Sequence, residues 1–329
     1  MRAFYRRRTH PASHDLSQPP SITLIAGPTA SGKSALALKM ARETGAVIIN
    51  ADSQQLYADL RILTARPSVE DEAQADHRLY GVADAGDAWS VGRWSRAVIA
   101  LLDDLRDQSR PAIVVGGTGL YFTALTRGLA DIPEISLAAR EATQADYLNQ
   151  GEDGFRQRLN SVDPISASLI AVGDHQRLVR AMSVYTQTGR TLTEWKKNTR
   201  PLLPIGEWTS LVVEPDRSQL YNACNQRVDR MMNDGVLAEV AALAAKEHPH
   251  SLPVTKAVGY RELASYLSGE LSRAEAVDAV KQATRNYAKR QLTWTRGQMR
   301  NWPRHACSRT AFPLLQSLHA RIDCRDNQG

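Results

Sequence analysis

The chain has 329 residues, of which 43% are hydrophobic, and its formal net charge at pH 7 is +6. This length and apolar fraction allow two or more domains, or one core with an insertion, and no segment is apolar enough to span a membrane. The three cysteines, Cys224, Cys307 and Cys324, lie too far apart for a structural zinc site or a disulfide framework, which favours a reducing compartment.

Residues 1–20 contain several arginines and Asp15 as their acid. This composition imitates an organelle transit peptide, but the segment shows no clear apolar face. We therefore expect a disordered basic extension.

The strongest motif is Gly-Pro-Thr-Ala-Ser-Gly-Lys-Ser at residues 27–34, which matches the phosphate-binding loop pattern completely. An apolar run at 22–26 precedes the motif and a helical pattern at 35–41 follows it, as this loop requires. Its backbone N–H groups and helix N-terminus would point at an anion. Lys33 would add a positive charge to the phosphates and Ser34 a hydroxyl to Mg²⁺. We therefore predict a di- or triphosphate site rather than a functionless glycine-rich turn.

Further apolar runs at 46–50, 111–115 and 211–213 alternate with helical patterns and predict buried strands. Such alternation is typical of an α/β fold, here a P-loop-containing parallel sheet core flanked by helices. Helical patterns without an obvious strand fill 131–205, which predicts a helical insertion domain. The expected organisation is a basic extension, a P-loop core, the insertion, a return to the core with C-terminal helices, and a polar tail: 1–20, 21–130, 131–205, 206–305 and 306–329.

Two polar residues follow predicted strands and would share one crevice with the phosphate loop. Asp52 could bind Mg²⁺, act as a general base or simply cap the next helix. Thr118 lies in a glycine-rich loop that could meet a substrate or form a tight turn. The acidic pair at 103–104 keeps helical spacing, so we predict an exposed helix face there rather than a magnesium-binding strand end.

A helix is predicted over 273–300, beginning with a capping box at Ser272. Its cationic side chains Lys281, Arg285, Lys289, Arg296 and Arg300 fall on one side. Val280, Ala283, Tyr287 and Trp294 fall on the other side, which we expect to pack on the core. No acid interrupts the cationic stripe within the helix. The stripe is therefore either a solvated face or a contact for nucleic acid or polyphosphate.

Several segments together resemble the tRNA dimethylallyltransferases, also called tRNA isopentenyltransferases, in the family's order over about residues 21–300. They are the phosphate loop, Asn50–Tyr57, Leu63–Pro67, Val115–Tyr121, Gln176–Arg180, Val258–Arg261 and Lys289–Trp294. The combination is specific, although the phosphate loop alone is not.

The resemblance implies transfer of a dimethylallyl group from dimethylallyl diphosphate to N6 of adenosine-37, in the anticodon stem-loop of tRNAs that read codons starting with U. It also implies a Mg²⁺-dependent, cytoplasmic, monomeric enzyme with no membrane partner. The implied catalytic residues are Asp52, Thr118, Lys33 and Arg227. The implied diphosphate site is Gly27, Pro28, Thr29, Ala30, Ser31, Gly32, Lys33 and Ser34, with Ser34 also on the metal. The implied tRNA contacts are Asp52, Ser53, Gln54, Gln55, Thr118, Gln176, Arg177, Arg180, Lys256, Gly259, Tyr260, Arg261, Lys289, Arg290, Trp294 and Arg296.

Three positions depart from the family pattern: Ala223 and Cys224 replace an Arg-Ile pair, and Thr295 replaces a bulky apolar residue. The alternatives to tRNA modification are an adenylate isopentenyltransferase acting on a free nucleotide, a P-loop kinase and a non-catalytic tRNA-binding protein. The helical insertion and the basic helix disfavour the first. The missing acid after Val115 disfavours the second, and the intact Lys33, Ser34 and Asp52 disfavour the third.

Overall fold

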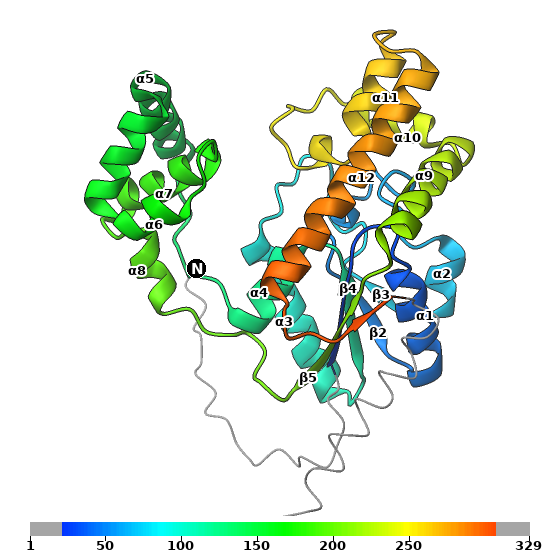
Figure 1. Cartoon of the computed structure of the whole chain (residues 1–329). Helices are drawn as coiled ribbons and strands as arrows, with labels where there is room; N and C mark the ends of the chain where they lie inside the picture. Colours follow the sequence, from blue (N-terminus) through cyan, green and yellow to red (C-terminus); the bar gives the residue numbers. More distant parts are fainter. Residues whose placement is uncertain (1–21, 307–329) are drawn as a thin grey trace, which may run out of the picture. The chain divides into compact units, whose positions relative to one another are not determined.

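The computed structural model describes residues 22–306 and has a six-stranded sheet at its centre (Figure 1). The strand order is β3-β2-β4-β1-β5-β6, and every neighbouring pair is parallel. The strands are β1 (Ile22–Ala26), β2 (Val47–Asn50), β3 (His77–Arg78), β4 (Ala112–Gly116), β5 (Trp208–Val213) and β6 (Arg304–His305). The predicted parallel α/β fold is confirmed.

Helices flank this sheet and also form a separate group (Figure 1). Those that precede the group are α1 (Lys33–Thr44), η1 (Ser53–Leu56), α2 (Val69–Gln74), α3 (Val91–Asp107) and α4 (Gly119–Arg127). The group itself contains α5 (Leu137–Val162), α6 (Pro164–Leu169), α7 (His175–Thr188) and α8 (Leu192–Lys197). After β5 follow α9 (Arg217–Asn233), α10 (Val236–Ala244), η2 (Val254–Lys256), α11 (Tyr260–Leu267) and α12 (Arg273–Gln298). None of the described helices is long and apolar enough to cross a bilayer.

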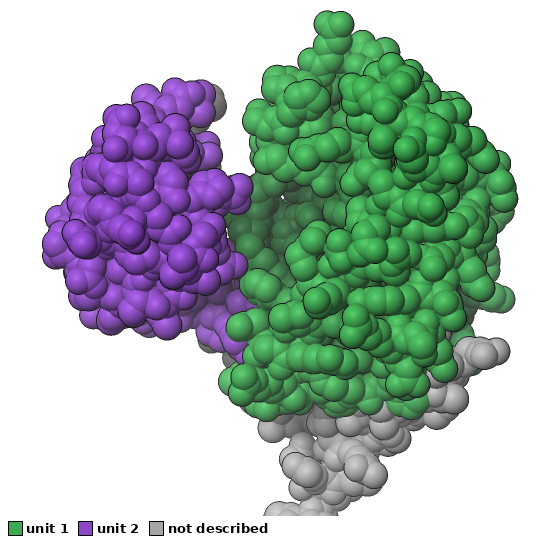
Figure 2. Space-filling view, turned by 45° about the horizontal axis from the view of Figure 1, so that its top comes forward, with its two compact units in different colours: residues 1–122, 204–329 green, residues 123–203 purple. Residues whose placement is uncertain are grey.

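The chain divides into two compact units (Figure 2). Among the described residues, the larger unit holds the sheet and comprises 22–122 and 204–306, whereas the smaller helical unit spans 123–203. The division between residues 122 and 123 falls within α4, whereas the sequence predicts that the helical insertion begins at residue 131. Its core is formed by apolar side chains of α5 and α7, including Phe155, Leu159, Leu178 and Met182.

Helices pack on the sheet through apolar side chains that alternate along the strands. Leu36 and Met40 of α1 pack in one cluster with Ile25, Ile48 and Val115 of three neighbouring strands. Since successive strand residues point to opposite faces, this cluster covers one face of the sheet. Burial of these side chains stabilises the fold by roughly 1.5–3 kcal/mol each and fixes the start of α1 beside the end of β1.

Trp94 of α3 supports the end of strand β2. Its indole Nε1 donates a hydrogen bond to the carbonyl oxygen of Asn50 at 2.9 Å, and its ring stacks on Tyr121 with the centroids 4.0 Å apart. The acidic pair at 103–104 lies on the exposed side of α3, as predicted. Strand β4 is followed by Gly117, Thr118 and Gly119, so no acid stands directly after that strand.

The predicted core face of α12 is wrong in part. Val280 is buried, but Ala283, Tyr287 and Trp294 are only half-buried, whereas the polar residues Gln291 and Thr295 are buried. Hydrophobic periodicity could not identify these two positions, since they are buried through hydrogen bonds. Strands β3 and β6 were not predicted either, because two-residue strands show no alternation. The basic extension, the polar tail, Cys307 and Cys324 lie outside the described residues.

Candidate active site

The phosphate loop connects β1 to α1 in a left-handed turn. Gly32 caps α1 with a φ of 85°, a conformation that residues with a side chain rarely adopt. Gly27 lies so close to β5 that a Cβ on it would be 2.7 Å from the carbonyl oxygen of Val213. The first-turn N–H groups of α1 have no acceptor within the helix, so they form a site for an anion.

Lys33 is buried beside this loop. Its Nζ donates a hydrogen bond to the carbonyl oxygen of Pro28 at 3.1 Å. Burial lowers the pKa of Lys33 from 10.5 to about 8; Asp52 opposes this shift and Arg227 adds to it. A buried ammonium with a lowered pKa is stabilised by a bound anion, and a diphosphate would supply that charge.

Arg227 of α9 brings a second cation to the loop. Its guanidinium Nη1 donates to the hydroxyl of Thr29, and Nη2 donates to the carbonyl oxygen of Leu63 at 3.4 Å. Burial lowers the pKa of Arg227, and its Nε has no hydrogen-bond partner. The structure therefore brings Arg227 to the phosphate loop. Asp216 occupies the N-cap position of α9, but its side chain makes no capping hydrogen bond.

Asp52 follows β2 and is buried with only 8% of its surface exposed. Its Oδ1 accepts a hydrogen bond from the backbone N–H of Gln54 at 3.0 Å, so the residue does cap a helix, as one interpretation held. Its Oδ2 faces the glycine-rich loop at residues 116–119, here called the glycine loop. This oxygen is 3.3 Å from the position that a Cβ on Gly117 would take. Helix capping therefore occupies Oδ1 and leaves the other oxygen on the side of the glycine loop.

Thr118 lies beside Asp52 because the two strand ends touch. A Cβ on Gly116 would be 2.1 Å from the backbone of Ala51, so only glycine permits this approach. The Thr118 hydroxyl accepts a hydrogen bond from the backbone N–H of Ser53 at 2.9 Å. The backbone N–H of Thr118 donates to the carbonyl oxygen of Ala51 at 3.1 Å. The glycine loop thus places a hydroxyl next to the segment that carries the buried carboxylate.

Some of these groups line one cavity. Its polar lining includes Thr29, Asp52 and Arg227. Its apolar lining includes four aliphatic side chains from separate elements, namely Leu63, Met231, Val258 and Val280. None of these four residues is among the predicted site residues, because a single aliphatic residue carries no chemical signal of its own. The cavity therefore combines an anion-binding end with a small apolar surface.

Glu239 of α10 is a further residue that sequence analysis missed. Its carboxylate accepts hydrogen bonds from the backbone N–H groups of Arg61, Ile62 and Leu63, at 2.5, 2.8 and 2.8 Å. These bonds hold the turn that presents Leu63 to the cavity and to Arg227. No motif signals this role, because the contact joins segments far apart in the sequence.

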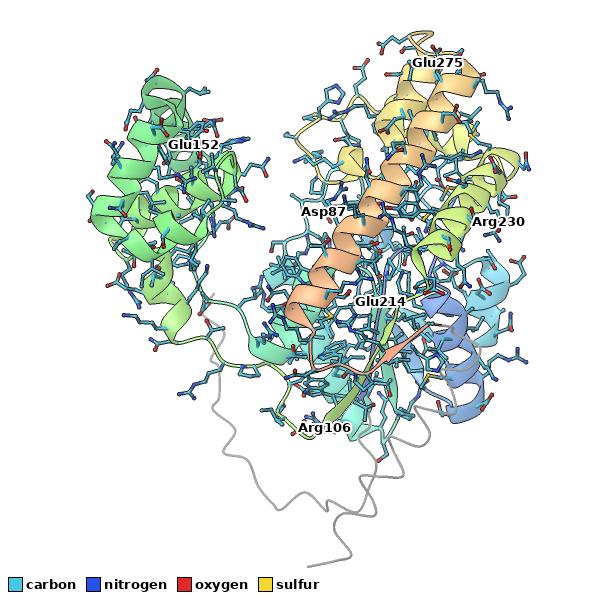
Figure 3. All side chains as sticks on the ribbon, viewed as in Figure 1. Asp87, Arg106, Glu152, Glu214, Arg230 and Glu275 are labelled. Carbon is cyan, nitrogen blue, oxygen red and sulfur yellow. The ribbon has the colours of Figure 1, made fainter. Side chains whose placement is uncertain are left out.

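Acids from α9 and from the segment after β5 neutralise part of the cationic stripe of α12. The stripe is therefore not a continuous positively charged surface, as the sequence of the helix alone suggested. Lys281 pairs with Asp229 at 2.6 Å, and Arg296 pairs with Glu214 at 2.7 Å. Glu214, labelled in Figure 3, also binds Arg304 and so ties β6 to α12. Within residues 22–306, Lys289 is exposed and makes no ion pair.

The other residues proposed for tRNA contact fall into two sets. Gln54, Gln55 and Ser53 lie in or beside η1, and the Gln54 side chain accepts from the backbone N–H of Val258 at 3.3 Å. Lys256 and Arg261 are exposed on either side of the buried Gly259 and Tyr260, and Arg290 lies over the ring of Tyr287. Gln176, Arg177 and Arg180 belong to α7 of the helical unit, where Arg177 pairs with Asp174 at 3.2 Å.

The departures from the family pattern are accommodated by packing. Cys224 is fully buried among Leu220, Ala288 and Leu292, where its thiol serves as a small apolar group. Thr295 is buried and donates its hydroxyl to the carbonyl oxygen of Leu292 at 3.0 Å. Ala223 is half-buried and adds no charge near Arg227.

These features define a P-loop protein in which a phosphate-binding loop and a buried carboxylate share one cavity. Family models match the chain: "IPP transferase" over residues 55–298 and "Isopentenyl transferase" over residues 20–86. A relative from Caulobacter sp. (strain K31), named tRNA dimethylallyltransferase, is 56% identical over 86% of this chain and 92% of its own length. The chain belongs to the tRNA dimethylallyltransferase family.

Solved structures agree with this assignment. The tRNA isopentenylpyrophosphate transferase of Bacillus halodurans matches with a TM-score of 0.65 and 25% identity, over 94% of this chain and all of that one. A eukaryotic dimethylallyltransferase, whose structure is described as acting on tRNA, shares the fold with a TM-score of 0.71 at 24% identity. That match covers 83% of this chain and 69% of the eukaryotic one.

Proposed function

We propose that this protein transfers the dimethylallyl group of dimethylallyl diphosphate to N6 of adenosine-37 in tRNAs that read codons starting with U. The observation that carries the proposal is the shared cavity. The buried cation Arg227, the carboxylate of Asp52 and Thr29 of the phosphate loop line it. A second buried cation, Lys33, is bound to Pro28 of the same loop. An enzyme that joins a diphosphate donor to an uncharged amine needs these groups together.

In the proposed reaction the bond between C1 of the dimethylallyl group and the diphosphate oxygen breaks as the bond from C1 to N6 forms. Lys33, Arg227 and the loop N–H groups stabilise the charge that develops on the departing diphosphate. Asp52 takes the proton that N6 loses, so the products are N6-dimethylallyladenosine, diphosphate and a proton. The Thr118 hydroxyl orients the reacting N6 amine by a hydrogen bond.

Mg²⁺ fits the donor end of this site. Ser34 is exposed in the first turn of α1, directly after Lys33 of the phosphate loop. No cluster of three acidic, histidine or cysteine ligands exists within residues 22–306, which suits an ion that takes most of its ligands from phosphate and water. Once bound, the ion would supply further positive charge to the leaving diphosphate.

The acceptor base must leave the anticodon-loop stack, which costs a few kcal/mol. Exposed cations on the larger unit, including Lys256, Arg261 and Lys289, would offset this cost by binding the RNA backbone. Arg177 and Arg180 of α7 would extend the contact to the helical unit. A free nucleotide needs no such surface, so tRNA is favoured over AMP as the acceptor.

Label transfer tests the proposal directly. The purified protein would be incubated with Mg²⁺, labelled dimethylallyl diphosphate and either unmodified tRNA or AMP. Label on tRNA alone is expected. Label on AMP would move the function to the free-nucleotide enzyme, and ATP hydrolysis without prenyl transfer would indicate a kinase.

Shortening Met231 is expected to relax selection for the five-carbon donor. Met231 lines the apolar side of the cavity, so Met231→Ala opens room for a longer chain. Each methylene accommodated in an apolar pocket changes selectivity by roughly 10–200-fold. The measurement is the ratio of kcat/KM for geranyl diphosphate to that for dimethylallyl diphosphate, which should rise about 10-fold or more.

Met232 provides the matched control, since it neighbours Met231 without lining the cavity. Met232→Ala should leave the ratio unchanged. An unchanged ratio in Met231→Ala, with a raised KM for tRNA instead, would assign this surface to the adenine.

Removing the charge of Lys289 is expected to weaken tRNA binding and flatten its salt dependence. Lys289 is an exposed cation without an ion pair among the described residues, so contact with one phosphate should contribute about 1 to the slope of log Kd against log salt. Lys281→Ala is the control on the same helix, because Asp229 already neutralises that lysine. Equal slopes for Lys289→Ala and the wild type would exclude the contact.

A further inference from the structure

Gln291 is a buried amide that connects two loops of the active site. Its Oε1 accepts a hydrogen bond from the backbone N–H of Thr29 in the phosphate loop, at 2.7 Å. Its Nε2 donates to the carbonyl oxygen of Gly117 in the glycine loop, at 3.0 Å. With only 6% of its surface exposed, this side chain uses both ends of its amide on the two loops that the proposed reaction brings together.

The glycine loop is shaped to fit α12 around this residue. A Cβ on Gly117 would lie 2.0 Å from Nε2 of Gln291, and a Cβ on Gly119 would lie 2.0 Å from the indole of Trp294. Tyr287, one turn before Gln291, interacts with the Thr118 hydroxyl. One side of α12 therefore contacts three successive loop residues, and the two glycines permit the close approach.

Each loop held by Gln291 also carries groups of the proposed mechanism. Thr29 accepts a hydrogen bond from Arg227, and Lys33 is bound to the preceding Pro28, so the phosphate loop positions the donor end. Gly117 precedes Thr118, whose hydroxyl is bound by the segment after Asp52, so the glycine loop positions the acceptor end. Gln291 is the side chain that spans from one to the other.

We propose that Gln291 is a positioning residue that fixes the spacing between the diphosphate donor and the adenine acceptor. The inference rests on the proposed function. Bond formation requires the reacting atoms to approach within about 3–3.5 Å, and an error of about 1 Å costs roughly 10²-fold in rate. Glutamine suits the role because its amide offers an acceptor and a donor at once. Asparagine has the same amide but is one methylene too short to reach both loops.

The test compares Gln291→Asn and Gln291→Met with wild type. Asparagine keeps the amide but not the span, and methionine keeps the length but loses both hydrogen bonds. For each variant, kcat would be measured at saturating dimethylallyl diphosphate and tRNA, and Kd for each substrate would be measured separately. Both variants are expected to lose roughly 10²-fold in kcat, with each Kd within about 3-fold of wild type.

Gln282 is the matched control on the same helix, since it is exposed and bonds only to neighbours within one turn of α12. Gln282→Asn and Gln282→Met should keep the wild-type kcat, and thermal unfolding would report the stability of all four variants. A kcat of Gln291→Asn within about 3-fold of wild type would overturn the proposal, as would a loss confined to the two Kd values. An inactive wild type would instead count against the proposed function.

Discussion

Asp52→Asn is expected to lower kcat by roughly 10²–10⁴-fold, the usual contribution of a general base. Asparagine retains an oxygen for the backbone N–H of Gln54, and it is as good a helix cap as aspartate, so the local fold should persist. What the substitution removes is the capacity of the side chain to take the N6 proton. Single-turnover transfer of labelled dimethylallyl to tRNA, with tRNA Kd measured alongside, would separate chemistry from binding.

Asp52→Ala is the companion variant, because alanine removes both the base and the cap. It should lose as much activity as Asp52→Asn and also about 0.5–2 kcal/mol of stability. Turnover near the wild-type value in the asparagine variant would leave Asp52 with a capping role alone. A large rise in tRNA Kd without a change in kcat would make it a binding residue.

Lys33→Met is expected to abolish most of the transfer activity and yet to stabilise the ligand-free protein. Electrostatic stabilisation by one such group contributes roughly 10²–10³-fold to rate. In the free protein, however, the ammonium is buried, and a pKa lowered from 10.5 to about 8 corresponds to an unfavourable contribution of about 3 kcal/mol at neutral pH. Methionine fills a similar volume without charge, so Tm should rise by several degrees.

The same pKa predicts how stability depends on pH. Between about pH 8 and pH 10.5 the unfolded chain still holds the Lys33 proton that the folded protein has released. The free energy of unfolding of the ligand-free protein should therefore rise with pH through this window, and the penalty should be fully present below pH 8. In Lys33→Met that contribution to the rise should vanish. Diphosphate should cancel the penalty in the wild type, because it stabilises the charged form.

Lys39→Met is the control for both effects, since Lys39 lies exposed on the same helix. It should change neither the pH dependence nor the transfer rate appreciably. Chemical denaturation at several pH values, with and without diphosphate, provides the measurement. A Tm for Lys33→Met below that of the wild type would show that the hydrogen bond to Pro28 outweighs the cost of burying the charge.

The sequence alone determined the phosphate loop, four of the strands and several helix starts, because each depends on residues that are close together in the chain. The order of residues 27–34 defines the phosphate loop, because the glycine positions and the lysine are needed within one turn. Apolar runs identified β1, β2, β4 and β5, and the capping boxes at Ser68, Thr191 and Ser272 mark helix starts where the structure has them. The start of α12 could therefore be predicted from the box at Ser272. Asp52 and Thr118 could be proposed because each follows a strand, and strand ends meet at one edge of a parallel sheet.

Only the tertiary structure decided which distant groups meet. Arg227 binds Thr29, Glu239 binds the turn at Leu63, and Gln291 binds both active-site loops. Each of these contacts joins segments that are more than 150 residues apart in the sequence. The acids that neutralise Lys281 and Arg296 come from outside α12, so inspection of that helix alone suggested an unbroken cationic stripe. Periodicity registers apolar burial but not burial through hydrogen bonds or ion pairs, because those depend on partners that the fold supplies.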